Sequence, residues 1–332
     1  MINVGINGFG RIGRRVFRLA ISHPDINVVA VNDLADVKTL GHLLKYDSIH
    51  GRLETLIKIE DNALIVEGRV IPFFNAKHPD LIPWGDHNVD IVIESSGKFK
   101  TKKDLAGHLK EGVEHVVLSV PPSEDAVKTI VLGVNDSTLT SEDTIVSNAS
   151  CTTNNAAPMM ALMHRNFGIN QAYITTVHSY TTDQSLHDVP HTDLRRARAA
   201  GQSIVPTTTG AAKALTKIFP DLSTVIGGCG IRVPVPNGSL TDMTINVQKP
   251  PSIEEVNAVF KRASQEEFKG IIEYTDDPIV SVDIIGNPHS CIFDSLMTSV
   301  IGNMVKIIGW YDNETGYSSR ILQLICNLSI KK

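Results

Sequence analysis

Near the start of the chain, a strand-like segment runs into the glycine-rich stretch Asn7-Gly8-Phe9-Gly10-Arg11-Ile12-Gly13. Apolar side chains alternate in residues 2–6, as in a β-strand, and recur at helical spacing in residues 11–20. In this context Gly8 permits a tight turn, Gly10 lets a pyrophosphate approach the backbone, and Gly13 lets the helix pack on the strand. The helix N-terminus offers unpaired N–H groups and the positive end of a dipole. The stretch therefore predicts a dinucleotide-binding turn, although a lone glycine pattern would also fit an ordinary turn.

An acidic residue follows this turn at a spacing that supports the same interpretation. Residues 28–31 form a second apolar strand, and Asp33 lies 20 residues after Gly13. At that distance a carboxylate can bond both hydroxyls of a ribose. The order of strand, glycine loop, helix, strand and acid is much more specific for dinucleotide binding than the glycines alone.

Strands and helices alternate through the first half of the chain. The apolar pattern predicts strands over residues 89–94, 115–120, 130–134 and 144–147, and a helix over 102–111. This alternation is typical of an α/β fold with a doubly wound, mostly parallel sheet of Rossmann type. Residues 55–74 differ, because two apolar runs separated by polar turn residues predict an antiparallel insertion.

Two short segments come directly after predicted strands. Ser95-Ser96-Gly97 follows one strand and Ser119-Val120-Pro121 follows the next. Ligands of doubly wound sheets bind at the carboxyl ends of the strands, so both segments are candidates for the ligand site. Plain turn residues would give the same pattern.

Cys151 is the candidate nucleophile. It is flanked by Ser150, Thr152 and other polar residues, which is a poor sequence for a buried core, and a helix is predicted over 156–167. Ser150 is suited to cap that helix, so Cys151 would lie on its first turn, where the positive end of the dipole favours the thiolate. The alternative is a small buried residue. We interpret the other three cysteines as structural.

A nucleophilic cysteine needs a base, and His178 is the best candidate among the 12 histidines. It ends a strand-like run and is followed by the hydroxyl residues Ser179, Tyr180 and Thr181. Taken alone, a histidine of this kind is more often a hydrogen-bonded structural residue. The pairing with Cys151 is therefore a hypothesis that only the tertiary structure can examine.

Two further segments point to bound anions. Arg195-Arg196-Ala197-Arg198 precedes a hydroxyl-rich loop, residues 206–209, which leads into a helix at Gly210, a geometry that binds anions. Arg232 stands in an apolar strand and needs a partner, either a structural carboxylate or a bound phosphate. Together they predict a site for two anionic groups, whereas the arginine cluster could instead belong to a solvated surface or a subunit interface.

The composition describes an ordinary globular protein. Its 332 residues include 31 basic and 36 acidic side chains, which gives a formal net charge of −5, and 42% are hydrophobic. The charge provides no overall field for nucleic acid or anionic membrane, and no apolar run approaches the roughly 18 residues of a membrane span. The N-terminus lacks a signal-peptide pattern, and the scattered cysteines suggest neither disulfides nor a metal site. We expect a cytoplasmic protein without a dedicated nucleic-acid or membrane partner.

The second half of the chain has longer strand candidates joined by short turns. Strands are predicted over residues 172–177, 241–247, 297–301 and 304–310, the last two as a hairpin, and a helix over 316–328. They indicate an α+β domain with a mostly antiparallel sheet and helices on one face. The polar loop over residues 184–202 is too long for a compact monomer unless it packs on something.

The chain resembles the phosphorylating, NAD-preferring glyceraldehyde-3-phosphate dehydrogenases of bacteria over essentially its whole length. The segments that carry the resemblance are residues 7–14, 45–48, 147–154, 178–181, 194–198, 209–213 and 310–314. It implies an NAD-binding domain of residues 1–149 and 316–332, a catalytic domain of residues 150–315, and a homotetramer. It also implies conversion of glyceraldehyde 3-phosphate, phosphate and NAD to 1,3-bisphosphoglycerate and NADH.

The resemblance assigns a role to each candidate residue. Cys151 would attack the aldehyde and carry a thioester, with His178 as its base, and no metal is implied. The cofactor site would consist of Gly8, Gly10, Arg11, Ile12, Gly13, Asp33, Lys77, Gly97, Ser119 and Asn313. The substrate and the attacking phosphate would meet Ser150, Thr152, Thr181, Arg196, Thr209, Gly210 and Arg232.

Asp33 bears on the choice between NAD and NADP. Asp33 would repel the 2′-phosphate of NADP, which favours NAD.

Three segments depart from the usual family pattern. Asn155 replaces the usual second cysteine, with little expected effect on the chemistry, and Gly238 replaces a usual valine, which is expected to loosen the start of the next strand. Residues 287–290 resemble the sister family that acts on erythrose 4-phosphate, which is the alternative activity. A dinucleotide-binding regulator is a further alternative, against which the intact Cys151 and His178 argue.

Overall fold

The computed structural model describes residues 1–330, which form two compact units. The first unit contains Met1–Ile130, Asp136–Ala149 and the chain from Ser318 onward, and the second contains Val131–Asn135 and Ser150–Tyr317. These units differ from the expected boundaries at residues 131–135 and 316–317, which both belong to the second unit. The first of these segments does so because Gly133 packs against Phe268.

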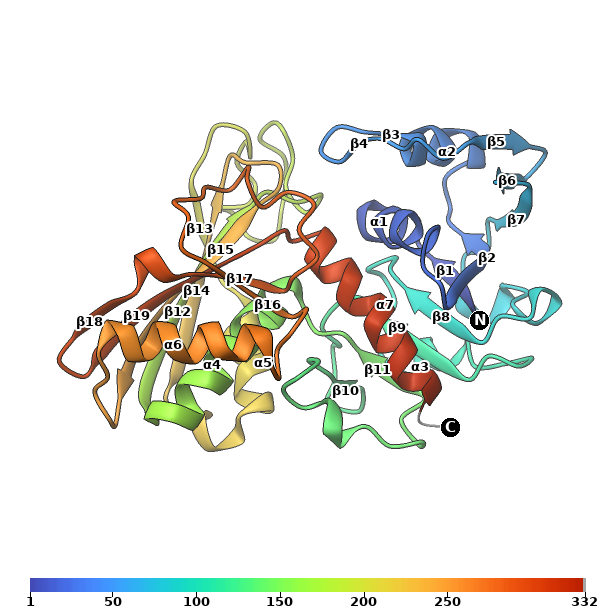
Figure 1. Ribbon diagram of the computed structural model, residues 1–332. Helices are drawn as coiled ribbons and strands as arrows, with labels where there is room; N and C mark the ends of the chain where they lie inside the picture. Colours follow the sequence, from blue (N-terminus) through green and yellow to red (C-terminus); the bar gives the residue numbers. More distant parts are fainter. Residues whose placement is uncertain (331–332) are drawn as a thin grey trace. The chain divides into compact units, whose positions relative to one another are not determined.

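A predominantly parallel sheet forms the centre of the first unit. Within residues 1–330 its strand order is β10-β11-β9-β8-β1-β2-β7-β6-β5, parallel from β10 to β7 and antiparallel from β7 to β5. Figure 1 shows β1 between β2 and β8. Val4 and Ile6 of β1 are fully buried, as expected for an inner parallel strand. The strands are β1 (Ile2–Asn7), β2 (Ile26–Asn32), β5 (Ile57–Glu60), β6 (Ala63–Val66), β7 (Arg69–Phe74), β8 (Ile91–Glu94), β9 (His115–Leu118), β10 (Lys128–Thr129) and β11 (Ile145–Ser147).

The helices of this unit correct two sequence predictions. The helix predicted over 102–111 ends at Ala106, because the chain turns at Gly107 and takes positive φ at Glu111 and Gly112. The strand predicted over 130–134 is wrong, because β10 ends at Thr129 and the next apolar residues are buried in turns instead of in the sheet. The predicted antiparallel insertion and the other strands are confirmed. The remaining elements are α1 (Arg11–Ala20), α2 (Val37–Lys45), α3 (Lys102–Ala106), the hairpin β3 (Tyr46–Asp47) and β4 (Gly51–Arg52), and 3₁₀ turns over Pro79–Leu81, Gly85–His87 and Asp136–Thr138.

The second unit is built on a mostly antiparallel sheet. Within the described part of the chain its strand order is β13-β14-β12-β15-β19-β17-β16, and β18 also pairs with β19. Only the pairs β12–β14 and β16–β17 are parallel among these described strands. The predicted α+β class is therefore confirmed. The strands are β12 (Ile169–Ser179), β13 (Val205–Thr207), β14 (Ile226–Val233), β15 (Ser239–Val247), β16 (Ile272–Thr275), β17 (Cys291–Asp294), β18 (Ser299–Ile301) and β19 (Met304–Tyr311).

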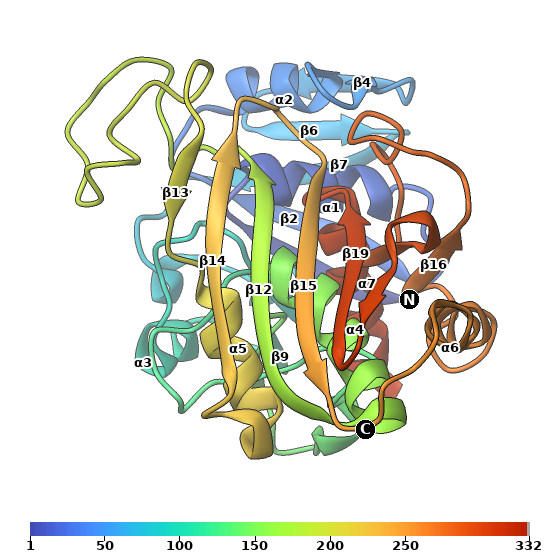
Figure 2. The same ribbon diagram turned by 90° about the vertical axis from the view of Figure 1, so that its left-hand side faces the viewer.

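Helices cover one face of this sheet. Figure 2 shows α4 (Cys151–Phe167) and α5 (Gly210–Ile218) behind strands β14, β12, β15 and β19. The strands alternate accordingly: Ile174 of β12 is fully buried, whereas its neighbour Tyr173 is 52% exposed. The other elements are α6 (Ile253–Gln265) and 3₁₀ turns over Pro220–Leu222 and Ser295–Met297, and α7 (Thr315–Ile330) begins in this unit and belongs to the first unit from Ser318 onward. Across residues 1–330, no helix has both the length and the apolar character needed to span a membrane.

One turn of the second unit differs from the sequence prediction, and another is built on a glycine. The first strand of the predicted hairpin begins at Ser299, because Asp294 caps a 3₁₀ turn over Ser295–Met297. Gly238 has a φ of +89°, and a Cβ there would lie 2.4 Å from the Ser281 carbonyl oxygen. The glycine therefore fits a tight turn that other residues would strain.

Candidate active site

A helix and a strand bring the candidate nucleophile and base together. Cys151 is the first residue of α4, and the N-cap Ser150 accepts a hydrogen bond from the Thr153 N–H at 3.1 Å. His178 is the penultimate residue of β12. Its Nε2 lies 3.4 Å from the Cys151 Sγ, although 27 positions separate the two residues in sequence. The thiol and the imidazole are thus within reach for proton transfer.

Hydrogen bonding determines which nitrogen of His178 accepts a proton. Nδ1 lies 2.7 Å from the carbonyl oxygen of Ser179 and 3.1 Å from the Arg232 Nη1, and we assign the proton to Nδ1 because its contact with the carbonyl oxygen is the shorter one. Nε2 is left with its lone pair toward the Cys151 sulfur. Burial and the neighbouring Arg232 charge lower the pKa of His178, so the imidazole is neutral at pH 7, although the same shift weakens it as a base.

The thiol is subject to opposing influences. Burial raises the pKa of Cys151, whereas the Arg232 charge and hydrogen bonds with Thr152 lower it. The thiolate expected from the position at the helix N-terminus is therefore opposed by desolvation. The nucleophilicity of the Cys151 sulfur therefore depends on transfer of the thiol proton to His178.

Arg232 is the cationic centre of this site. It lies opposite His178 in the parallel pairing of β12 with β14. Its Nη1 donates to the Ser179 carbonyl oxygen at 2.9 Å and to the Thr181 Oγ1 at 3.4 Å. Of residues 1–330, no carboxylate forms an ion pair with this guanidinium. The first alternative, a structural carboxylate, is therefore excluded, and the charge is available to an anionic ligand.

The arginine cluster is tied to the hydroxyl-rich segment. Arg196 forms an ion pair with Asp183 at 2.6 Å and donates to the Thr207 Oγ1 at 2.9 Å. Thr209 caps α5 by accepting a hydrogen bond from a backbone N–H, so that Gly210 begins the helix. Arg196 is thus anchored next to a helix N-terminus, where an anion is favoured.

Tyr311 belongs to this site, although the sequence analysis did not single it out. Its hydroxyl lies 2.9 Å from the Thr152 Oγ1 and 2.9 Å from the Thr176 Oγ1. Its ring packs edge-on against His178, with 6.0 Å between the ring centroids. The Thr152 hydroxyl is therefore already hydrogen-bonded to the protein. Tyr311 lies in a segment that carried the family resemblance, but nothing in the local pattern distinguished it from a core residue.

The glycine loop in the first unit has the geometry of a phosphate cradle. A Cβ on Gly8 would lie 2.3 Å from the Ser96 backbone nitrogen, and a Cβ on Gly13 would lie 2.2 Å from the Gly8 carbonyl oxygen. By contrast, no described atom lies within 4 Å of the position that a Cβ on Gly10 would take. Gly10 is also the N-cap of α1, so the open space faces a helix N-terminus. These residues fit the pyrophosphate of a dinucleotide.

Arg11 and Ile12 are the first two residues of α1. The Arg11 side chain forms an ion pair with Asp47 at 2.7 Å, and the Ile12 side chain is half-buried. The side chain of Arg11 is therefore directed to β3, and a contact of either residue with a pyrophosphate would use the backbone.

The other cofactor candidates of this unit follow the ends of strands. Asp33 follows β2, and its carboxylate accepts a hydrogen bond from the Phe9 N–H at 2.6 Å, which places it at the glycine loop. Gly97, with a φ of +70°, lies in the turn after β8. Ser119 is buried directly after β9, and Lys77 is exposed after β7. Adjacent parallel strands thus bring these loops to one edge of the sheet.

Asn313 and Asn155, both in the second unit, have different hydrogen-bond partners. The Oδ1 of Asn313 accepts hydrogen bonds from the hydroxyls of Ser179 at 2.9 Å and Ser239 at 3.0 Å. Asn313 therefore belongs to the unit that contains the cysteine–histidine pair. Asn155 is fully buried, and its Nδ2 donates to the carbonyl oxygen of Gly309 at 3.2 Å. This bond directs it toward β19.

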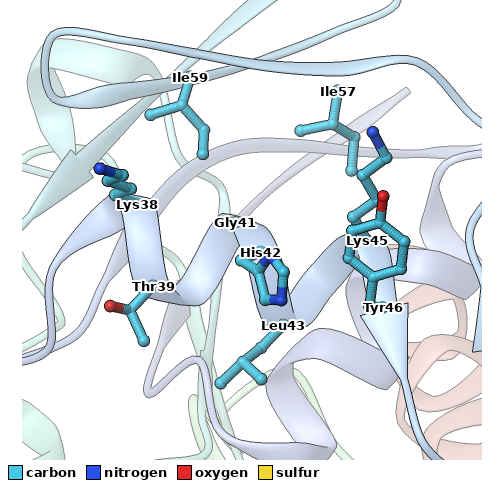
Figure 3. A pocket seen from close by; sticks show the side chains of 9 residues that line it. All are labelled: Lys38, Thr39, Gly41, His42, Leu43, Lys45, Tyr46, Ile57 and Ile59. Carbon is cyan, nitrogen blue, oxygen red and sulfur yellow. The ribbon is translucent and has the colours of Figure 1, made fainter.

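The structure also shows a hollow that contains none of the predicted site residues. It is a surface cavity of about 660 Å³ against α2 and β5 (Figure 3), lined by Lys38, Thr39, Gly41, His42, Leu43, Lys45, Tyr46, Ile57 and Ile59. Within residues 1–330, no group of three or more His, Cys, Asp or Glu side chains is arranged to hold a metal ion.

The whole chain is similar to proteins of known activity. Residues 2–102 match a family model described as the NAD binding domain of glyceraldehyde 3-phosphate dehydrogenase, and residues 150–313 match the model of its C-terminal domain. The chain is 50% identical to glyceraldehyde-3-phosphate dehydrogenase of Geobacillus stearothermophilus over 99% of both chains. It is 51% identical to glyceraldehyde-3-phosphate dehydrogenase 2 of Streptomyces avermitilis over 97% of both. The matches cover both units and leave no large segment unexplained, so the chain belongs to the glyceraldehyde-3-phosphate dehydrogenase family.

Proposed function

We infer that the protein oxidises glyceraldehyde 3-phosphate with NAD and inorganic phosphate, forming 1,3-bisphosphoglycerate and NADH. The observation that carries this inference is the Cys151–His178 contact at 3.4 Å beside Arg232. The family membership and the names of the relatives support the same activity. Neither of these relatives is named for erythrose 4-phosphate, and the resemblance of residues 287–290 to that sister family gains no support.

The reaction begins with a proton transfer. His178 Nε2 takes the thiol proton of Cys151, and the sulfur attacks the aldehyde carbon. The imidazolium then donates this proton to the developing oxyanion, which gives a hemithioacetal. NAD, when bound, accepts the hydride that leaves the hemithioacetal carbon. His178 takes the hydroxyl proton as the hydride leaves, and a thioester remains on Cys151. A phosphate oxygen attacks the thioester carbon, the acyl phosphate departs, and the thiolate is restored.

Two anion sites serve this sequence. Arg232 and Thr181, which lie 3.4 Å apart, are assigned to the phosphate group of the substrate. The attacking phosphate is assigned to Arg196 and the start of α5 at Thr209 and Gly210. Ser150 and Thr152 complete this second site by their position on either side of the nucleophile. Charge-assisted hydrogen bonds from arginine suit phosphate oxygens at both places.

The activity is tested by following NADH formation from glyceraldehyde 3-phosphate with and without inorganic phosphate. We expect rapid formation with phosphate, because phosphate releases the acyl group from Cys151. Without phosphate, NADH formation should stop after about one equivalent per active site, since the thioester persists. Faster turnover of erythrose 4-phosphate under the same conditions would favour the alternative activity. Absence of turnover with both aldehydes, despite NAD binding, would favour the regulator.

The same assay measures the choice of cofactor. Asp33 places a carboxylate at the glycine loop, where it can bond a ribose and repel a 2′-phosphate. We expect kcat/KM with NAD to exceed that with NADP at least about tenfold, a discrimination of only about 1.4 kcal/mol. Asp33→Asn should reduce this preference. Equal kcat/KM values for NAD and NADP in the parent protein would contradict the assignment of Asp33.

We also propose that the protein is a homotetramer. The face of the second sheet opposite α4 and α5 carries exposed apolar residues such as Tyr173 and Met304. The loop over residues 184–202 is long, and its exposed Leu186 and Leu194 give it an apolar surface. Both surfaces suit contacts with further copies of the chain. We expect light scattering to give four times the mass of the chain, and an active monomer on dilution would contradict this.

A cytoplasmic location is proposed on the basis of cysteine chemistry. All four cysteines are free in the described part of the chain, and Cys151 must stay reduced to act as a nucleophile. A reducing compartment meets that requirement. Cell fractionation that found the active protein outside the cytoplasm would contradict the proposal.

A further inference from the structure

A chain of buried polar side chains in the first unit takes no part in the chemistry proposed above. Glu94, the last residue of β8, and His108 are both fully buried, and Glu94 Oε2 lies 3.0 Å from His108 Nε2. The Trp84 indole N–H donates to His108 Nδ1 at 3.0 Å. A buried carboxylate is costly unless it is surrounded by hydrogen-bond donors. The hydrogen-bond partners of Glu94 therefore show which parts of the protein its carboxylate holds in place.

The hydrogen bonds define which atoms donate and which accept in this network of buried side chains. An indole nitrogen can only donate, so His108 Nδ1 is an acceptor and the ring proton lies on Nε2. Neutral His108 thus donates to Glu94 Oε2, which also accepts from the Asn7 Nδ2 at 2.5 Å. Glu94 Oε1 accepts from both the N–H and the hydroxyl of Ser96. Four donors surround the carboxylate, so both of its oxygens act as acceptors.

The donors on Oε1 belong to the turn after β8. The Ser96 N–H lies 2.8 Å from Glu94, and the Ser96 hydroxyl, which also donates to Glu94, accepts a hydrogen bond from the Lys98 N–H at 3.2 Å. The Ser95 hydroxyl donates to the Gly8 carbonyl oxygen at 2.6 Å. Because a Cβ on Gly8 would lie 2.3 Å from the Ser96 nitrogen, this turn packs directly on the glycine loop. Glu94 therefore holds the turn after β8 in place against the glycine loop.

Asn7 carries the network to two further loops. Its Oδ1 accepts a hydrogen bond from the Asn32 Nδ2 at 2.8 Å. Asn32 in turn pairs through both amide atoms with the backbone of Ala76, at 2.8 and 3.1 Å. Asn32 immediately precedes Asp33, and Ala76 immediately precedes Lys77. The loops after β1, β2, β7 and β8 are thereby tied to one buried carboxylate.

We propose that Glu94, held by hydrogen bonds from His108, Asn7 and Ser96, is a positioning residue for the dinucleotide. It acts through hydrogen bonds that hold four loops in the arrangement that receives NAD, and it does not act on the reacting atoms. This proposal rests on the NAD dependence inferred above. A change at Glu94 should therefore weaken NAD binding more than it slows the chemistry.

Glu94→Gln is the direct test, because its amide NH₂ would face side chains that are themselves donors. By titration calorimetry we expect the Kd for NAD to rise at least about tenfold, with a parallel rise in KM for NAD. We expect kcat at saturating NAD to fall less than about threefold. Glu60→Gln, an exposed glutamate at the end of β5, is the matched control and should keep the parental Kd.

The outcomes separate this proposal from the proposed function. A parental Kd in Glu94→Gln, or a fall in kcat without a rise in KM for NAD, overturns the role of Glu94. Failure of the parent protein itself to bind NAD overturns the proposed function instead. A rise in KM for glyceraldehyde 3-phosphate equal to that for NAD would indicate general damage and would also contradict a positioning role.

A double-mutant cycle tests whether Glu94 acts through the turn. Ser96 is exposed, so Ser96→Ala removes one donor to Glu94 without opening the core. We expect this change to weaken NAD binding in the parent and to have no further effect in Glu94→Gln, because the two groups act together. Additive effects would contradict the mechanism. Should Glu94→Gln not fold, Glu94→Asp, which keeps the charge but is too short to reach both sets of donors, replaces it with the same expectation.

Discussion

Replacing Cys151 by serine is expected to lower kcat at least about 10⁴-fold while the Kd for NAD stays within about twofold of the parental value. A serine hydroxyl is a far weaker acid than a thiol, so His178 at the same distance cannot generate a comparable nucleophile. The glycine loop and Asp33 belong to the other compact unit and are not altered by the substitution. NADH formation measures the first quantity and calorimetry measures the second.

Cys229→Ser is the matched control for this prediction. Cys229 is also partly buried and free, but it lies in the middle of β14 and has no histidine partner in the described chain. We expect its kcat to equal that of the parent. Turnover retained by Cys151→Ser would show that the nucleophile has been assigned wrongly, even if NAD still binds.

Replacing His178 by asparagine is expected to lower kcat by about 10²- to 10⁴-fold, the usual contribution of a general base. Asparagine has no counterpart of the Nε2 atom that lies 3.4 Å from the sulfur. The hydride and thioester steps both need this atom, because it takes the hydroxyl proton of the hemithioacetal. Cys151 remains present, so the variant should still be alkylated by iodoacetamide.

The pH dependence of that alkylation tests the contact between Nε2 of His178 and the sulfur. Burial raises the pKa of the Cys151 thiol, so without a base the thiolate forms only at higher pH. Burial also lowers the pKa of His178, which favours the uncharged pair, and the 3.4 Å contact through which Nε2 can take the proton opposes both shifts. We therefore expect the alkylation profile of His178→Asn to move to higher pH and to meet the parental rate only in alkaline solution.

His164→Asn provides the control for the histidine prediction. His164 lies in the same helix as Cys151, but at its C-terminal end, where it pairs with Asp221 at 2.9 Å. Its alkylation profile and kcat should match those of the parent. An unshifted profile in His178→Asn would show that the thiol ionises without this imidazole.

Much of the first unit could be predicted because its signals are local. The change from alternating to helical spacing at the glycine loop marks the end of β1 and the start of α1 within one residue of the structure. In the second unit, the N-cap role of Ser150 followed in the same way from a hydroxyl residue before a helical pattern. Such features depend on neighbours within about one helical turn, and these neighbours are adjacent in the sequence.

Other features depend on contacts that sequence spacing does not show. Ile130 and its neighbours are as apolar as a buried strand, yet they are buried in turns, so the strand predicted there was wrong. Glu94, His108 and Trp84 came from three separate segments and suggested nothing when read singly. Tyr311 had the pattern of a core residue until its hydroxyl was found between two threonines.

The amino-acid sequence thus determined the fold class of each unit and the position of the glycine loop. It also identified Cys151 as the candidate nucleophile. Only the tertiary structure decided which groups meet: His178 with Cys151 at 3.4 Å, and Arg232 with no carboxylate of residues 1–330 in ion-pair contact. The reason is physical. Hydrophobic periodicity and capping act along the chain, whereas pKa shifts, tautomers and hydrogen-bond networks arise from burial beside groups that are distant in sequence.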